Sequence, residues 1–383
     1  MAEEEARGIG KARHNGVHEH QGCADVEGCG PRAVNGWCHE GDLTIATSNP
    51  KENGKKAEEA GNQCNGTALP LSCACAHEAL IDSVIRYMDN DIDVSSLSNE
   101  AVKLLKLIPE GYIPVPHQVG GHRHVDGKFG FLRRIGQPEI LFKPVQPGAK
   151  GLNEVIFYDK LFNCTGELHD DIQKLKDLVP RFIGCEKIRD RADHLHEFLK
   201  LEDITHHFRR PAIMDVKIGK RVWDDYAEQD KIERERKKYP DQEVIGFRII
   251  GMRVFRPKQN DYVYYDRFYG RSVTADTALS ALNRFFEDGS SRRLDVIDTL
   301  LEQLVPFLQW AEKQRTLKLF ASSLLIVYEG DTSQPVGTGG LLKVKLVDFA
   351  HAYEKADEGL DENSAFGMRI FMSYLRRLRE KDI

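Results

Sequence analysis

The chain has 383 residues, of which 41% are hydrophobic, and its formal net charge is −6. The acidic balance argues against a general nucleic-acid-binding protein, and the lack of a signal sequence and of a bilayer-spanning apolar run predicts a soluble cytoplasmic protein, with a nuclear fraction as the alternative. The length is large for a single core, so we expect two lobes and a tail, with the eight cysteines as free thiols.

The first part of the chain predicts a tail and then a small lobe. Residues 1–77 are rich in glycine and polar residues without helical or strand periodicity, which predicts a disordered tail. The small lobe, residues 78–203, begins with two short helices between Leu80 and Leu107. An antiparallel meander follows, with strands predicted at 117–122, 128–133 and 140–145, then a helix at 153–162 and strands at 178–185 and 198–203.

The second lobe, residues 204–383, is predicted to be larger and to mix strands with long helices. Apolar runs predict strands at 213–216, 244–255, 322–328 and 342–349. Helices are predicted at 275–287 with Thr274 as its cap, at 292–315 with a kink or break at Pro306, and from 361–363 to Arg379. The predicted fold class is therefore α+β with two lobes, the smaller one built on an antiparallel sheet.

Two features of the pattern suit the binding of a nucleoside triphosphate. Lys143 lies in an apolar strand, and Glu154 follows on the next helix, where it could hold the lysine against phosphates. Asp348 ends an apolar strand, where a carboxylate can ligate Mg²⁺. The alternative for the first feature is that Lys143 is a surface lysine and Glu154 is unrelated to it. The alternative for the second is that Asp348 is only an aspartate in a turn at the end of the strand. The chain contains no P-loop sequence and no His-Arg-Asp catalytic loop, which argues against P-loop enzymes and protein kinases.

Other basic residues suit an acceptor that carries several phosphates. Lys231, Arg234 and Lys238 are spaced to share one face of a helix. The alternative is a solvated face, because acidic residues alternate with them. Asp215 and Lys217 are two residues apart in a strand and therefore face the same side, so the aspartate could serve the nucleotide and the lysine an anionic acceptor.

Three motifs, in order along the chain, resemble the inositol polyphosphate kinase family. They are Pro-Ala-Ile-Met-Asp-Val-Lys-Ile-Gly at 211–219, Ser-Ser-Leu-Leu at 322–325 and Asp-Phe-Ala-His at 348–351. The resemblance runs from about residue 117 to 378, or about two thirds of the chain. The stretches 198–206, 238–240, 245–247 and 269–272 resemble the multikinase subfamily, whereas the hexakisphosphate kinases are less similar.

The resemblance implies a kinase-like fold with ATP between the lobes. It implies transfer of the ATP γ-phosphate to ring hydroxyls of inositol tris- and tetrakisphosphates, with ATP and Mg²⁺ as cofactors and a monomeric protein. Two alternatives stay open: a phosphatidylinositol bisphosphate kinase that meets its lipid at a membrane surface, and a non-catalytic scaffold that binds inositol phosphates.

The resemblance also implies roles for single residues. Three are implied to be catalytic, with Asp348 as the metal ligand: Lys143, Lys217 and Asp348. ATP is implied to contact Lys143, Glu154, Glu202, Ile204, Asp215 and Asp348. The acceptor is implied to contact Gln146, Lys150, Lys217, Lys231, Arg234, Lys238 and His351. Animal multikinases tend to have glutamines where this chain has Arg234 and Glu235, which bears on acceptor preference.

Overall fold

The computed structural model describes residues 73–121, 129–333, 340–354 and 359–380. Nearly all of the predicted tail lies outside these ranges, so its disorder stays a prediction. The last five tail residues, 73–77, belong to the first helix, α1 (Cys73–Met88). These five residues are therefore helical and not part of a disordered tail.

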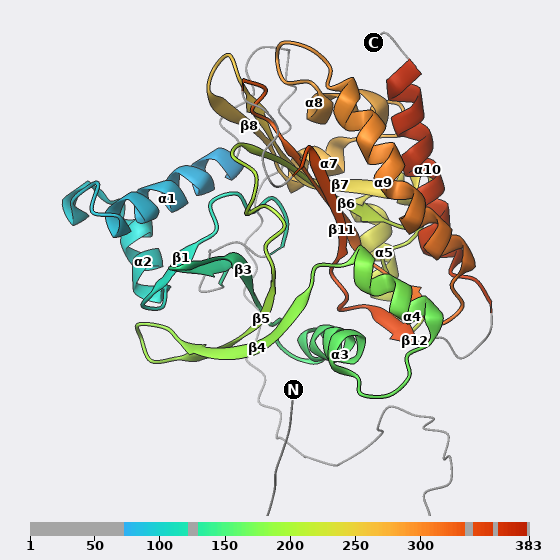
Figure 1. Cartoon of the computed structure of the whole chain (residues 1–383), viewed down its shortest axis with the longest axis horizontal. Coiled ribbons are helices and arrows are strands. Elements are labelled where there is room, and N and C mark those ends of the chain that lie inside the picture. The colour runs from blue at the N-terminus through green and yellow to red at the C-terminus, as the bar shows by residue number, and fades with distance from the viewer. Residues whose placement is uncertain (1–72, 122–128, 334–339, 355–358, 381–383) are drawn as a thin grey trace, which may run out of the picture. The chain divides into compact units, whose positions relative to one another are not determined.

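The first sheet has five antiparallel strands in the order β1-β2-β3-β5-β4 (Figure 1). Its strands are β1 (Tyr112–Pro114), β2 (Leu132–Arg134), β3 (Gln137–Pro144), β4 (Phe182–Arg189) and β5 (Leu195–Glu202). The helices in the same part of the chain are α1, α2 (Asn99–Leu107), α3 (Ala149–Asn163) and α4 (Asp170–Leu175), with short 3-10 turns at Val94–Ser96 and Lys176–Leu178. Apolar residues of α1 and α2, including Ile81 and Leu104, share one core cluster with Phe142 of β3 and Phe198 of β5.

The second sheet also has five antiparallel strands, in the order β11-β10-β6-β7-β8. They are β6 (Pro211–Ile218), β7 (Phe247–Arg256), β8 (Asp261–Tyr265), β10 (Ser323–Glu329) and β11 (Leu342–Val347), while β9 (Leu317–Leu319) pairs with β12 (Ala352–Glu354). The helices are α5 (Gln229–Lys238), α6 (Gln242–Ile245), α7 (Arg267–Ser272), α8 (Ala278–Phe286), α9 (Leu294–Lys313) and α10 (Glu362–Glu380). Figure 1 shows α9 and α10 side by side along this sheet.

The central strand β6 carries the two charged residues that the sequence singled out. Its other six residues are apolar and buried, as expected for a strand covered on both faces. In register with β10, Asp215 lies opposite Leu325 and Lys217 opposite Ser323. Buried charges are unfavourable unless they are paired or serve a ligand, so this strand already indicates a site.

The main core crosses the division that the sequence predicted after residue 203. One cluster contains Tyr158 of α3 and Leu201 of β5 together with Met214 of β6 and Phe349 after β11. The two sheets are distinct, but α3 and β5 pack against the second sheet as well as the first. The exact lobe boundary therefore stays a prediction.

One predicted strand is wrong. The segment 117–121 is a loop, and the first strand of the meander is β1, five residues earlier. Two consecutive glycines end the segment, and Gly121 has a φ of +75°, a conformation that other residues rarely adopt. The loop is held by contacts to residues far along the chain, described below, which local sequence cannot reveal.

Two helix details also differ from the prediction. Thr274 does not cap a helix at 275, because α8 begins at Ala278 after a turn in which the Thr277 hydroxyl accepts a hydrogen bond from the Thr274 N–H (2.8 Å). Helix α9 continues through Pro306 without the break that was one of the two predicted outcomes, and the other, a kink, stays a prediction. Leu304 and Phe307, on either side of the proline, are buried in the core, and this packing stabilises the helix against the lost backbone hydrogen bond.

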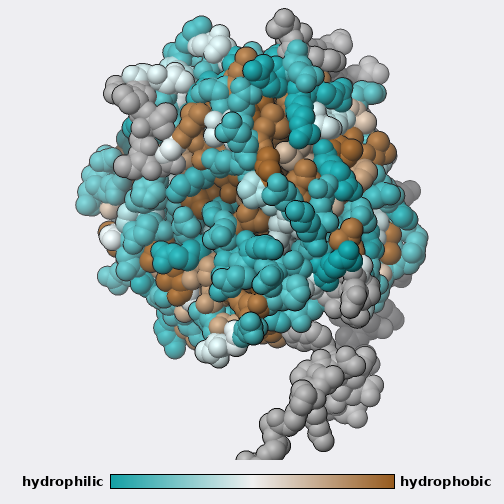
Figure 2. Space-filling model, turned by 45° about the vertical axis from the view of Figure 1, so that its right-hand side comes forward, coloured by the Kyte–Doolittle hydropathy of each residue, from teal (hydrophilic) through white to brown (hydrophobic). Residues whose placement is uncertain are grey.

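The surface carries no membrane-spanning feature in the part of the chain that the structure describes. None of the helices found there is both long and apolar enough to cross a bilayer. Figure 2 shows that hydrophilic residues cover most of the face in view, with apolar residues gathered near its middle. Cys164 and Cys185 are free thiols, as predicted.

Candidate active site

A pocket lies where the first sheet meets the second. It is open to solvent, and the space it encloses together with its open mouth is about 750 Å³. Apolar side chains from both sheets form its walls, among them Leu141, Leu201, Ile213, Leu325 and Val347. Charged side chains are also part of the lining: Lys143, Glu202, Asp203, Asp215 and Asp348. A mostly apolar pocket with a few converging charges is the usual form of a ligand site.

Lys143 of β3 joins the two sheets at this pocket. Its Nζ lies 2.7 Å from Glu154 Oε1 on α3 and 2.7 Å from Asp348 Oδ1, which follows β11. Glu154 is fully buried, and its Oε1 also accepts a hydrogen bond from the Phe349 N–H (3.1 Å). Burial alone would lower the pKa of Lys143, but the Asp348 and Glu154 carboxylates outweigh it and raise this pKa, so the ammonium stays charged.

Asp348 has an unusual backbone. Its φ is +67°, in the left-handed region that non-glycine residues seldom occupy, and the Ser322 hydroxyl donates a hydrogen bond to its carbonyl (2.9 Å). Such conformations concentrate at functional sites, where surrounding structure maintains them. The Asp348 side chain is 34% exposed, so solvent and small ions can reach its carboxylate, while the buried Lys143 holds it in place.

Asp215 contributes a second carboxylate to the pocket. It is only 5% exposed, and its Oδ1 has no hydrogen-bond partner among the described residues. Burial, and then the negative charge of Asp348, raise the pKa of Asp215 to about 6. A buried acceptor atom without a donor is rare in native proteins, and a ligand hydroxyl would satisfy it.

The loop 117–121 closes the pocket over Asp215. Gly120 approaches so closely that a Cβ at this position would overlap Oδ2 of the aspartate. The loop is anchored through His117, whose Nε2 lies 2.7 Å from the Thr205 hydroxyl. Burial and the Arg133 charge lower the pKa of His117 to about 3, so this histidine is neutral.

The same anchor includes a buried ion pair just after β5. Arg133 Nε donates to Asp203 Oδ2 (2.7 Å), and the Thr205 hydroxyl donates to Asp203 Oδ1 (2.5 Å). Glu202 and Ile204, on either side of Asp203, line the pocket wall. Their predicted backbone contacts to adenine stay a prediction.

Lys217 has a neighbour that sequence reasoning missed. It lies opposite Arg248 of β7 in the sheet register, so the two cations face the same side. Arg248 is 7% exposed, and no other residue in the described part of the chain forms a hydrogen bond with its Nη1. Burial lowers the pKa of Lys217, although the Asp348 and Asp215 charges oppose the shift. A half-buried lysine beside a buried arginine that has an unsatisfied donor suits an anionic ligand.

A third group forms around another residue that the sequence did not reveal, Asp224. Its Oδ2 lies 2.8 Å from His351 Nδ1 and 3.1 Å from Lys231 Nζ. Burial, and then the Lys231 charge, lower the pKa of His351, although the Asp224 carboxylate opposes the shift. Asp224 thus brings together two predicted acceptor residues, one from α5 and one from the segment after β11.

The remaining predicted acceptor residues divide into two sets. On α5, Lys238 is half-buried and donates to Glu235, which is also half-buried, whereas Arg234 is exposed. The inward face of α5 therefore includes Glu235 in place of Arg234. Gln146 lies in the connection from β3 to α3, and Lys150 lies in the first turn of α3. The backbone carbonyl of Gln146 approaches Gly151 so closely that a side chain at this position would overlap it.

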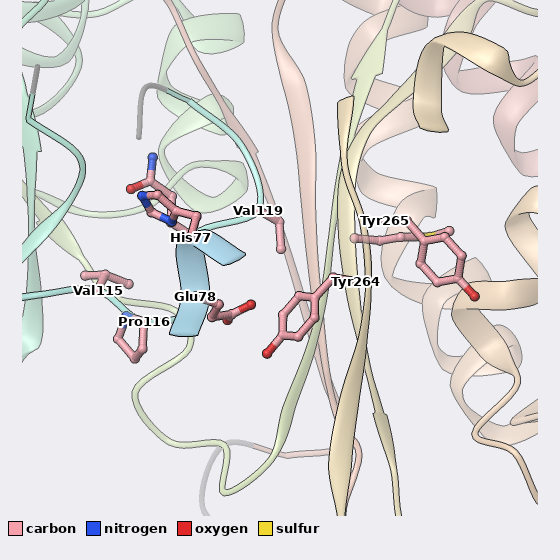
Figure 3. Close-up of a pocket in the computed structure, with 9 residues that line it drawn as sticks. His77, Glu78, Val115, Pro116, Val119, Tyr264 and Tyr265 are labelled. Carbon is pink, nitrogen blue, oxygen red and sulfur yellow. The ribbon is translucent and has the colours of Figure 1, made fainter. Parts of the chain in front are cut away.

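A smaller pocket lies behind the loop, between α1 and the edge of the second sheet. Figure 3 shows Glu78 and Tyr264 pointing toward one another across it, with Val115 and Val119 alongside. Glu78 forms an ion pair with Arg253 of β7 (3.2 Å). None of the predicted site residues lies here, and the contact attaches α1 to the second sheet.

Known proteins resemble part of this chain. A model of the inositol polyphosphate kinase family matches residues 198–376. The inositol polyphosphate multikinase of Homo sapiens is 37% identical over 230 residues, which cover 60% of this chain and 53% of that protein. The inositol hexakisphosphate kinase 3 of Mus musculus is 30% identical over 207 residues, 49% of this chain and 52% of that protein. The chain thus spans about half the length of these curated relatives.

A solved structure also shares the fold. It is the inositol phosphate multikinase Ipk2 of S. cerevisiae in complex with ADP and Mn²⁺, which is 24% identical, with a TM-score of 0.51, and the match covers 63% of this chain and 99% of that chain. The predicted α+β fold class is confirmed by this likeness and by the two antiparallel sheets. The predicted resemblance to the family is confirmed as well.

Proposed function

We propose that the chain is an inositol polyphosphate kinase and that it transfers the ATP γ-phosphate to ring hydroxyls of inositol tris- and tetrakisphosphates, as its similarity to the family model and to the multikinases supports. The observation that carries the proposal is the convergence of Lys143, Glu154 and Asp348 at an apolar pocket, beside a second group of cations. A pocket lined by these charged groups, with cations beside it that could bind an anionic acceptor, is what phosphoryl transfer between two phosphorylated molecules requires.

On the nucleotide side, the chain offers a distinct group for each part of ATP. Glu202 and Ile204 flank the wall where the base would lie, and Oδ1 of Asp215 could accept a hydrogen bond from a ribose hydroxyl. Lys143 would contact the phosphates while Glu154 holds it in place. The accessible Asp348 carboxylate is a hard oxygen ligand that fits Mg²⁺, which would neutralise charge on the phosphates when bound.

On the acceptor side, Lys217 and Arg248 lie nearest the junction with the nucleotide. They would hold a phosphate of the acceptor and stabilise charge in the transition state, because catalysis of phosphoryl transfer depends mainly on positioning and electrostatics. Lys231 and His351, held together by Asp224, would contact a second phosphate or hydroxyl. The lowered pKa of His351 keeps it neutral near pH 7, so it can accept a hydrogen bond.

The test is an assay of the purified full chain with MgATP and inositol trisphosphate. We expect ADP and more highly phosphorylated inositols, with turnover abolished or severely reduced in Asp348→Asn and Lys217→Ala. Replacing Arg248 by methionine, which keeps much of its packing volume, should raise the KM for the acceptor while the KM for ATP changes little. Undiminished turnover in Asp348→Asn and Lys217→Ala would refute the assignment.

The same assay separates the two alternative functions. Vesicles that contain phosphatidylinositol bisphosphate, offered in place of the soluble acceptor, test the lipid kinase. Binding of inositol phosphates without any ATP turnover would instead support the non-catalytic scaffold. The paired Lys143 and Asp348 favour catalysis over the scaffold, because a protein that only bound inositol phosphates would have no use for them.

A further inference from the structure

Three side chains of metal-ligating type converge at the turn between β4 and β5. Asp190 follows β4, His194 precedes β5, and His196 lies within β5. One ligand atom of each residue, a carboxylate oxygen or a ring nitrogen, lies within 4.8 Å of the other two. The turn belongs to the first sheet and extends away from the second one (Figure 1), so this cluster is separate from the pocket and from the acceptor residues.

The carboxylate of Asp190 is fixed in position by the backbone. The residue is 6% exposed, and its Oδ1 accepts hydrogen bonds from the N–H groups of Ala192 and His194, each at 2.9 Å. The turn is closed by the Asp190 N–H, which donates to the His194 carbonyl (2.9 Å). The other oxygen, Oδ2, is therefore presented in a fixed direction, which is the kind of support that protein metal ligands usually have.

Both imidazoles face this second oxygen. Oδ2 of Asp190 lies 3.2 Å from His194 Nδ1 and 3.0 Å from His196 Nε2. The ring of His196 packs on Phe129, with ring centroids 4.4 Å apart, which limits its rotation. His194 is 71% exposed, so its ring can adjust and the open side of the cluster faces water.

The two distances from Asp190 Oδ2 to the imidazole nitrogens match those between neighbouring ligands of one ion. Ligand atoms about 2.1 Å from a zinc ion lie roughly 3.0 to 3.4 Å apart in octahedral or tetrahedral geometry. Two imidazoles and one carboxylate form a set that suits zinc and related divalent transition metals, while Mg²⁺ prefers oxygen ligands. The exposed side leaves room for water to complete the coordination shell.

We propose that Asp190, His194 and His196 form a binding site for a divalent transition-metal ion, with zinc as the expected occupant. The ion would replace the two histidine–carboxylate hydrogen bonds and fix the β4–β5 turn. Since β5 runs from this turn to Glu202 at the pocket wall, an ion here would stabilise the outer part of the sheet that carries one side of the nucleotide site. The site does not depend on the proposed enzymatic activity.

Cobalt and zinc titrations of the full-length protein, stripped of metal and free of nucleotide, test the proposal. Because the sequence outside the described residues also contains histidines and cysteines, the readout is the difference between variants. Wild type should bind one Co²⁺ equivalent more than the His194→Ala/His196→Ala protein, with the d–d absorption of a nitrogen- and oxygen-ligated ion. Zinc should raise the unfolding temperature of wild type more than that of the variant.

Two further variants make the test specific. His169→Ala removes another exposed histidine that lies beside an aspartate, Asp171 (3.5 Å), and should leave metal stoichiometry unchanged. The single variant His194→Ala changes a largely exposed side chain, so it should fold, and its Co²⁺ affinity should fall at least about tenfold. Equal stoichiometry and equal affinity in wild type and His194→Ala would overturn the proposal.

Discussion

The buried pair of Lys143 and Glu154 allows stability and catalysis to be separated by a double-mutant cycle. The two side chains are 10% and 1% exposed and lie 2.7 Å apart. Removing one partner of a buried pair typically costs about 3–5 kcal/mol, because the other charge stays buried alone. We expect Lys143→Met to lose that much stability, since it leaves Glu154 without its cation.

Glu154→Gln should cost less, about 1–2 kcal/mol, because Lys143 keeps Asp348 as a partner and the new amide oxygen can still accept from the Phe349 N–H. The effect of Glu154→Gln on the free energy of unfolding should have the opposite sign when Lys143 has already been replaced. In the Lys143→Met protein, Glu154→Gln removes an unpaired buried charge and should restore stability. All three variants should lose phosphoryl transfer, because the phosphate-binding ammonium is absent or misplaced.

Urea unfolding at pH 7 measures the stability of the four proteins, and ATP consumption with inositol trisphosphate measures their activity. Lys160→Met is a matched control on α3, because Lys160 pairs with Glu354 at the surface, where both side chains are more than 40% exposed. It should cost under about 1 kcal/mol. The reasoning is refuted if Glu154→Gln destabilises the Lys143→Met protein as much as it destabilises wild type, or if the double variant regains turnover.

Three other predictions concern the centre of the pocket. Asp215→Asn should mainly raise the KM for ATP, and Lys217→Ala should mainly raise the KM for the acceptor, as steady-state kinetics with each substrate varied in turn would show. If both variants raised both KM values equally, the assignment of Asp215 to the nucleotide and of Lys217 to the acceptor would be wrong. Gly120→Ala should weaken nucleotide binding by tenfold or more because its methyl group overlaps the Asp215 carboxylate, whereas Gly166→Ala, where a Cβ meets nothing closer than 3.8 Å, should bind nucleotide like wild type. The raised pKa of Asp215, about 6 against an ordinary 3.8, means that the folded state holds this proton more tightly than the unfolded state. The protonated Asp215 therefore contributes stability that is fully present below about pH 4 and is lost as the pH rises through 6. In unfolding experiments, the stability of Asp215→Asn relative to wild type should increase between pH 4 and 7. The difference between the two proteins would be constant over this range if the pKa of Asp215 were ordinary.

Much of the second sheet could be predicted because its signals are local. An apolar run interrupted only by Asp215 and Lys217 indicates both a buried strand and a site, and this is what β6 provides. Lys143 and Glu154 were found in the same way, since a strand followed by a helix brings a lysine and a glutamate eleven positions apart into contact.

The parts that sequence reasoning missed depend on contacts between distant residues. Arg248 joins the site only through its register with Lys217, and Asp224 links Lys231 to His351, which is 127 positions further along the chain than the aspartate. The loop at 117–121 reads as a strand, but its anchor is Thr205, 88 positions away. On α5, helical periodicity places residues 234 and 235 on adjacent sides, and only the packing of the helix decides which one faces the site.

The central claim is tested most directly by analysis of the reaction products. Purified protein, MgATP and inositol trisphosphate are incubated, and the inositol phosphates are separated and assigned ring position by ring position. The account predicts tetrakis- and higher phosphates formed in step with ADP by wild type, and none by Lys143→Met or Asp348→Asn. Formation of the same products by Asp348→Asn at the wild-type rate, or no product from folded wild type, would contradict it.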